Sequence, residues 1–68
     1  MKSHEIMAIA RNANDAVIRA EAEDPMIVGI NVNATCYRFD DGSVIMISGA
    51  QVYAYNDEME LLEDMGNE

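Results

Sequence analysis

The fold is decided by residues 37–55, which read Tyr37-Arg38-Phe39-Asp40-Asp41-Gly42-Ser43-Val44-Ile45-Met46-Ile47-Ser48-Gly49-Ala50-Gln51-Val52-Tyr53-Ala54-Tyr55. Asp-Gly between apolar runs is the strongest short-range signal for a β-hairpin, because a type I′ turn needs positive φ at both central residues. We therefore predict a two-residue turn at Asp41-Gly42 and a second turn at Gly49-Ala50. The product is a three-stranded antiparallel meander.

Two-residue turns determine which residues lie opposite one another. The first turn places Tyr37 opposite Met46, and the second places Met46 opposite Tyr53. Because side chains alternate across a sheet, this register divides the strands into two faces. One face is expected to carry Tyr37, Phe39, Val44, Met46, Tyr53 and Tyr55, and the other Arg38, Ile45, Ile47, Val52 and Ala54, with Cys36 beside them. Both faces are largely apolar, so each needs cover by a helix or by a partner.

The residues before the meander predict one amphipathic helix over residues 3–23. Its apolar stripe has the 3-4 spacing of a helix and consists of Ile6, Ile9, Ala10, Ala13, Val17 and Ala20. Ser3 is the candidate N-cap, and Pro25 ends the helix. Two interpretations stay open for residues 26–34, a short buried strand or an apolar linker, since Gly29 and the asparagines at 31 and 33 favour irregular backbone.

The residues after the meander predict a second, short helix over residues 56–65. Asp57 and Glu60 have the spacing of a capping box, with Asn56 as the other candidate cap, and Gly66 is the expected stop. At 100° per residue, one side of this helix carries Met59, Leu61, Leu62 and Met65. That apolar side is able to cover one face of the sheet.

The chain is expected to form one small α+β domain, residues 1–68, with an N-terminal helix, a three-stranded antiparallel meander and a short acidic C-terminal helix. Half of its residues are hydrophobic, which argues against disorder. Its single cysteine excludes an internal disulfide. No apolar signal region follows Met1, and no run approaches the roughly 18 apolar residues of a membrane span, so we expect a cytoplasmic protein.

Charge is the strongest global property of the chain. Thirteen acidic residues against four basic ones give a net charge of −9, and the last basic residue is Arg38. Eight acidic residues follow it: Asp40, Asp41, Asp57, Glu58, Glu60, Glu63, Asp64 and Glu68. Such a surface repels nucleic acid and lipid headgroups and attracts basic proteins. The alternative is that the charge serves solubility alone.

The sequence offers few groups for catalysis or metal binding. His4 is the only histidine, and Cys36, the only cysteine, alternates into a strand, where it is better interpreted as a small core residue. No Cys/His cluster has zinc spacing, and no glycine-rich loop precedes a helix. The tract from Asp57 fails as a calcium loop, because Met59 and Leu61 take ligand positions. We expect no enzyme activity, no metal, no cofactor, and no direct binding to nucleic acid or membrane.

The meander resembles that of a known family. The run Tyr37-x-Phe39-Asp40-Asp41-Gly42-Ser43-Val44-Ile45, followed by Ser48-Gly49 and Tyr53-Ala54, is similar to the hairpin of small acidic anti-CRISPR proteins. These proteins of phages and mobile elements inhibit type I systems, in the I-F and I-C subtypes, by acting on the Cascade surveillance complex. The resemblance extends to the alanine-rich segment before the meander and to the acidic residues after it.

The resemblance implies DNA mimicry. Such inhibitors present carboxylates where Cascade expects DNA phosphates, and they occupy the basic channel of its large subunit that recognises the PAM. The partner-binding residues implied here are Asp40, Asp41, Asp57, Glu58, Glu60, Glu63 and Asp64. The expected protein is a monomer, encoded by a phage or mobile element and acting in the bacterial host. The alternative is an acidic interaction module, an adaptor or antitoxin-like protein, that neutralises another basic partner.

Overall fold

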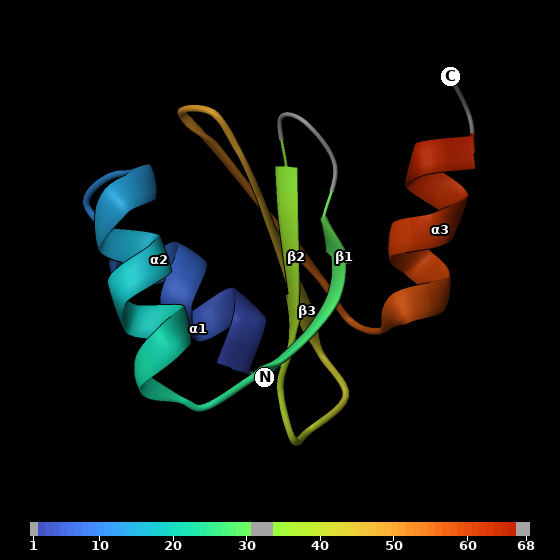
Figure 1. Cartoon of the computed structure of the whole chain (residues 1–68), viewed down its shortest axis with the longest axis horizontal. Coiled ribbons are helices and arrows are strands. Elements are labelled where there is room, and N and C mark those ends of the chain that lie inside the picture. Colours follow the sequence, from blue (N-terminus) through green and yellow to red (C-terminus); the bar gives the residue numbers. More distant parts are fainter. Residues whose placement is uncertain (1, 31–33, 67–68) are drawn as a thin grey trace.

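One antiparallel sheet with helices on both sides organises the chain (Figure 1). The structure is a computed structural model that describes residues 2–30 and 34–66. Its elements are α1 (Lys2–Ile9), α2 (Ala13–Ala22), β1 (Met26–Ile30), β2 (Ala34–Arg38), β3 (Val44–Ser48), β4 (Gln51–Tyr55) and α3 (Glu58–Gly66). The strands lie in the order β1-β2-β3-β4, each antiparallel to its neighbour. The α+β class is therefore confirmed, but the meander has four strands and two helices precede it.

The fourth strand is β1, which belongs to residues 26–34, the segment for which the sequence allowed two interpretations. β1 pairs with β2 along the edge of the sheet, with a bulge between Ile27 and Gly29. It is a strand but not a buried one, because Met26 and Ile27 are 58% and 54% exposed. The predicted irregular backbone at residues 31 and 33 lies outside the described residues.

The single N-terminal helix predicted over residues 3–23 is wrong, because the chain breaks between α1 and α2. Asn12 is extended and caps α2, its side chain accepting the backbone N–H of Asp15 at 2.8 Å. Asp15 in turn accepts the backbone N–H of Arg11 at 3.1 Å, so two backbone donors are satisfied reciprocally as in a capping box. The break leaves Ile9 of the predicted stripe 55% exposed.

Ser3 is not the N-cap of α1 but a buried residue within it. Its backbone N–H donates to the hydroxyl of Ser43 at 3.1 Å, and its own hydroxyl donates to the carbonyl of Tyr55 at 3.0 Å. These bonds attach α1 to the hairpin loop and to the end of β4. A serine fits here because a buried hydroxyl needs a partner, and this one donates to the carbonyl of Tyr55.

The first hairpin does not have the two-residue turn predicted at Asp41-Gly42. The N–H of Gly42 donates to the carbonyl of Phe39 at 3.0 Å, and the N–H of Phe39 donates to the carbonyl of Ser43 at 2.9 Å. Gly42 has a φ of 88°. This is the three-residue loop in which a turn is followed by a left-handed glycine bulge. The carboxylate of Asp41 favours it by accepting the N–H and the hydroxyl of Ser43 at 2.9 and 2.6 Å.

The extra loop residue shifts β2 by one position against β3. Tyr37 pairs with Ile45 and not with Met46. Because side chains alternate, a one-residue shift moves every side chain of a strand to the opposite face. The predicted faces are therefore wrong for β2 relative to β3. They are right between β3 and β4, where the turn at Gly49-Ala50 pairs Met46 with Tyr53.

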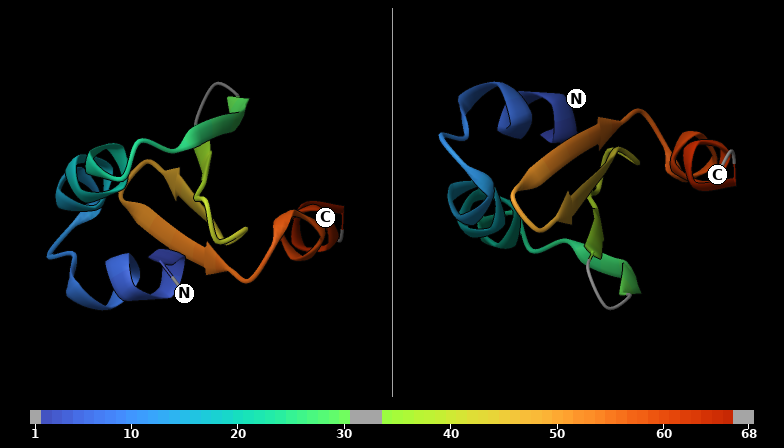
Figure 2. Two further views of the ribbon diagram at one scale, coloured as in Figure 1. Left: turned by 90° about the horizontal axis from the view of Figure 1, so that it is seen from below. Right: turned by 90° about the horizontal axis from the view of Figure 1, so that it is seen from above.

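The corrected register produces two cores of unequal size. The larger core lies under α1 and α2 and contains Ile6, Ala16, Ala20, Tyr37, Phe39, Ile45 and Ile47. The smaller core lies on the α3 side and contains Cys36, Val44, Tyr55 and Leu61. Figure 2 shows α1 and α2 together on one side of the sheet and α3 on the other.

Helix α3 has the predicted cap but covers less of the sheet than predicted. Asp57 accepts the N–H of Glu60 at 2.8 Å, and Glu60 reaches back to the side-chain amide of Asn56 at 2.9 Å. Gly66 is the last helical residue. Leu61 is buried, whereas Met59, Leu62 and Met65 are 69%, 63% and 43% exposed. The predicted apolar side is therefore too broad, because α3 buries only Leu61.

Replacing Gly42 by valine tests the three-residue loop. A β-branched residue is strained at a φ of 88°, so Gly42→Val should destabilise the protein by about 1 kcal/mol or more in chemical denaturation. Gly66→Ala is the control, because a Cβ meets nothing within 4 Å at either glycine but Gly66 has no positive φ. Equal stability of the two variants would contradict the left-handed glycine.

A pair of isoleucine variants tests the position of the larger core. Ile47 is 7% exposed and belongs to the larger core, against which Val17 also packs, so Ile47→Ala should lower the free energy of unfolding by about 2 to 4 kcal/mol. Ile18, on the outer side of α2, is 59% exposed, and Ile18→Ala should change it by less than about 0.5 kcal/mol. Similar losses in both variants would show that the helices do not cover this face.

The loop should also make stability depend on pH. The hydroxyl of Ser43, the backbone N–H of Lys2 and the N–H of Ser43 lower the pKa of Asp41 to about 2. A carboxyl whose pKa falls on folding stabilises the protein above its unfolded pKa of about 3.9 and loses that contribution as pH falls toward 2. The melting temperature of the wild type should therefore exceed that of Asp41→Asn above pH 4, and the difference should shrink between pH 4 and pH 2. A difference independent of pH would contradict this environment for Asp41.

Candidate functional site

The acidic hairpin loop and the start of α3 are held close together by the first turn of α1. The ammonium of Lys2 lies 2.6 Å from Asp40, and the backbone N–H of Lys2 donates to Asp41 at 2.8 Å. The next two residues contact the end of β4 and the residue that follows it. The hydroxyl of Ser3 donates to the carbonyl of Tyr55, and Nε2 of His4 lies 2.9 Å from the side-chain oxygen of Asn56. Asp40 and Asp41 are thus brought toward the junction from which the α3 carboxylates begin.

Four of the predicted partner-binding carboxylates around α3 have partners within the chain. Asp57 caps the helix, and Glu60 accepts from Asn56. Glu58 forms an ion pair with the guanidinium of Arg38 on β2. Asp64 accepts the hydroxyl of Tyr55 at 2.6 Å. These contacts fix the positions of the carboxylates on the helix.

Glu63 differs from the other acidic residues of α3. It is exposed, and among the described residues it has no hydrogen bond or ion pair. Glu68, at the end of the acidic tract, lies outside the described residues. Six of the seven predicted site residues therefore have a structural contact of their own, and Glu63 alone projects from α3 without one in the part of the chain described.

Two side chains near the site, Tyr55 and Cys36, have a raised pKa. Burial, together with the carboxylate of Asp64 that accepts its hydroxyl, raises the pKa of Tyr55 well above the usual range. Burial raises the pKa of the Cys36 thiol, which reduces its nucleophilicity at neutral pH. Cys36 is a core residue as expected, but it belongs to the smaller core on the α3 side and not to the face of Ile45 and Ile47, because the register of β2 is shifted by one residue.

All four basic side chains are paired with acidic ones. Lys2 contacts Asp40 and Glu23, and Arg38 contacts Glu58. Arg11 and Arg19 both contact Asp15, at 4.0 and 2.9 Å. Because the chain has thirteen acidic residues and four basic ones, nine carboxylates remain in excess of the cations. The surface therefore presents negative charge to a partner.

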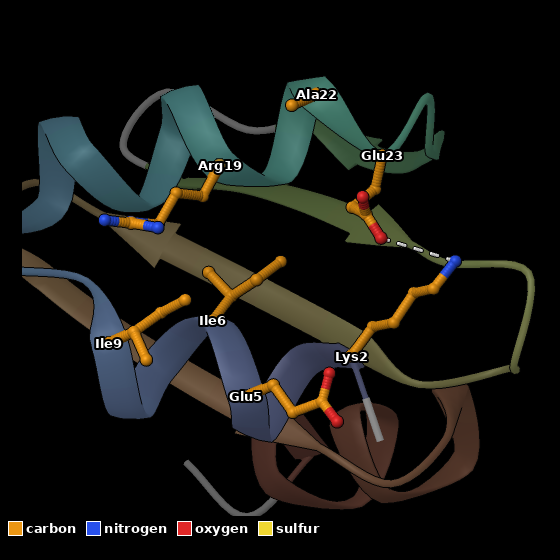
Figure 3. Close-up of a pocket in the computed structure, with 7 residues that line it drawn as sticks. All are labelled: Lys2, Glu5, Ile6, Ile9, Arg19, Ala22 and Glu23. Carbon is orange, nitrogen blue, oxygen red and sulfur yellow. Dashed lines mark ion pairs between the residues drawn. The ribbon is translucent and has the colours of Figure 1, made fainter.

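A pocket of about 300 Å³ lies between α1 and α2, on the side of the sheet opposite α3 (Figure 3). Lys2 and Arg19 line it together with Glu23, and Ile6 and Ile9 supply apolar walls. Lys2 is 3.4 Å from Glu23, and Arg19 is held by Asp15. Because each cation is neutralised by a neighbouring carboxylate, the pocket has little charge with which to bind an anion.

Among residues 2–30 and 34–66, no three His, Cys, Asp or Glu side chains lie close enough to hold a metal ion. In the same part of the chain, each helix is too short or too polar to cross a bilayer.

Sequence reasoning missed the residues that position the acidic groups. Nothing in the local pattern of Lys2 points to the hairpin loop 38 residues away. Tyr55 was expected on an apolar face, and its hydroxyl carries no sequence signal for Asp64. The ion pair of Arg38 could have been predicted. Arg38 is the last basic residue of the sequence, and every charged residue after it is acidic, so one of these carboxylates is expected to pair with it.

Comparisons with known proteins identify no relative. No protein-family model matches the chain, and neither a curated protein nor a solved structure is similar enough to count as a match. The function proposed below therefore rests on the resemblance of the meander, together with charge and geometry.

Proposed function

We propose that this protein is a non-enzymatic inhibitor that mimics DNA and binds the basic, PAM-recognising surface of the large subunit of a type I Cascade complex. Bound there, it blocks access of target DNA. The observation that supports this function is the series of carboxylates along α3, in a protein whose basic side chains are all paired internally.

The spacing of the carboxylates suits this role. Residues 57–64 contribute Asp57, Glu58, Glu60, Glu63 and Asp64. Arg38 neutralises Glu58, so four charges remain over these eight residues. At a rise of about 1.5 Å per residue the eight residues span about 12 Å, or roughly 3 Å per charge. One strand of B-DNA carries a charge about every 3.4 Å, so the linear density along α3 is of the same order.

The internal contacts of these carboxylates favour binding. A carboxylate has about four acceptor sites, so one hydrogen bond to Asn56 or Tyr55 leaves room for a lysine or arginine of the partner. The same hydrogen bonds restrict the side chains before binding, which reduces the entropy lost on association. Glu58 is the weakest contributor, since Arg38 already neutralises it.

An acidic module that neutralises a different basic partner, such as an adaptor or antitoxin-like protein, would use the same carboxylates. The two functions differ in one respect. A DNA mimic competes with target DNA for the lysines and arginines of Cascade, whereas the other module leaves DNA binding by Cascade unchanged.

A matched pair of triple variants tests the proposal. Glu60→Gln, Glu63→Gln and Asp64→Asn together remove three charges from α3 while keeping side-chain size. This triple variant should lose most of its inhibition of DNA binding by Cascade, and the wild type should lose inhibition steeply as salt rises. Single substitutions should have small effects, because exposed ion pairs contribute about 0 to 1 kcal/mol each.

The control removes the same charges elsewhere. Glu5→Gln, Glu21→Gln and Asp24→Asn change three exposed acidic residues on and after the N-terminal helices, across the sheet from α3 (Figure 1). This variant should inhibit like the wild type, with circular dichroism confirming that both triples are folded. Equal inhibition by the two triples, or binding of the wild type to Cascade without displacement of DNA, would overturn the proposal.

A further inference from the structure

A second pocket, of about 450 Å³, lies where α1, β4 and α3 meet. Its lining consists of His4 and Met7 from α1, Tyr53, Ala54 and Tyr55 from β4, and Asp64 from α3. The pocket in Figure 3 contains Lys2 and Arg19, whereas the described residues that line this one include no lysine or arginine. The fixed charge of this pocket is therefore the carboxylate of Asp64.

The carboxylate of Asp64 is held at the pocket but is not neutralised there. It accepts the hydroxyl of Tyr55 at 2.6 Å, and Tyr55 is a buried residue of the smaller core. In the part of the chain that the structure describes, all four basic side chains pair with other carboxylates. A carboxylate has about four acceptor sites, so the bond to Tyr55 leaves most of them for a ligand.

The histidine of the pocket also favours a ligand that donates hydrogen bonds. Nδ2 of Asn56 donates to Glu60 at 2.9 Å, so Oδ1 of Asn56 is the acceptor that faces Nε2 of His4 at 2.9 Å. Nε2 therefore carries the proton, and in the neutral ring Nδ1 of His4 is an acceptor. The hydroxyl of Tyr55 already donates to Asp64. The pocket thus offers more acceptors than donors.

An exposed aromatic ring and two apolar side chains complete the lining. Tyr53 is 41% exposed and Met7 is 48% exposed. A guanidinium is planar and stacks on an aromatic ring while its N–H groups reach a carboxylate, whereas an ammonium is a compact, strongly hydrated charge. Long basic side chains also bury their methylenes on apolar surface, which Met7 and Ala54 provide. This combination of groups selects arginine.

We infer that the pocket binds the guanidinium group of one arginine of a partner protein, with the ring of Tyr53 against its face and the carboxylate of Asp64 at its edge. The inference deepens the proposed function and rests on it for the nature of the partner, a protein with a basic surface. It adds a requirement that charge alone does not impose, because the aromatic ring distinguishes arginine from lysine.

Three short peptides test the pocket on the full chain. Each has blocked ends and glycines around one central residue, which is arginine, lysine or citrulline, the uncharged counterpart of arginine. In NMR titrations the arginine peptide should shift the signals of Tyr53 and Met7. It should bind about tenfold more tightly than the citrulline peptide, since it adds an ion pair and a cation–π contact, and about threefold more tightly than the lysine peptide. Arginine binding no tighter than either of the other two would overturn the inference.

Two matched pairs of variants locate the binding. Asp64→Asn removes the charge but keeps an oxygen for the hydroxyl of Tyr55, and Glu63→Gln removes a neighbouring charge of α3 that does not line the pocket. The first should weaken binding of the arginine peptide about threefold and the second should not. Tyr53→Leu should weaken it by about the same factor, whereas Tyr53→Phe, which keeps the ring, should not.

Equal losses within either pair would refute the pocket. Tyr53 is exposed and belongs to neither core, so its two variants keep the test decisive even if Asp64→Asn unfolds the protein. None of these measurements involves Cascade or DNA, so the pocket and the proposed function fail separately.

Discussion

The carboxylate of Asp41 is the group on which the arrangement of this protein depends. It accepts the N–H and the hydroxyl of Ser43 and the backbone N–H of Lys2, and so stabilises a three-residue loop. The loop sets the pairing of β2 with β3, and that pairing decides that Tyr37 lies under the N-terminal helices while Cys36 faces α3. A single side chain at a hairpin tip thereby determines the composition of both cores.

Local patterns predicted the parts of the fold that depend on neighbouring residues. The turn at Gly49-Ala50 and the cap at Asp57 both form as predicted. The first hairpin escaped prediction because Asp-Gly fits a two-residue and a three-residue loop, and the choice involves Lys2, 39 residues before Asp41. The helix break could have been found, since Asn12 and Asp15 have the spacing of a cap inside a continuous apolar stripe.

The candidate site shows the same division between local and distant information. The sequence alone marked the acidic residues, because their number and spacing are independent of the fold. It could not show that Asp64 binds Tyr55 or that Glu58 binds Arg38, since these partners come from different strands. Several carboxylates consequently stabilise the fold through their contacts within the chain. An experiment on partner binding therefore has to distinguish the loss of their charge from the loss of these contacts.

The bonds of Ser3 have a consequence for the order in which the fold forms. Ser3 bonds to Ser43 and Tyr55, which follow it in the sequence by 40 and 52 residues. Helix α1 has no sheet to pack on until the hairpins have formed, and contacts of such long sequence separation form slowly. The larger core, which includes Ile6 of α1, is therefore completed late in folding, after the strands have paired.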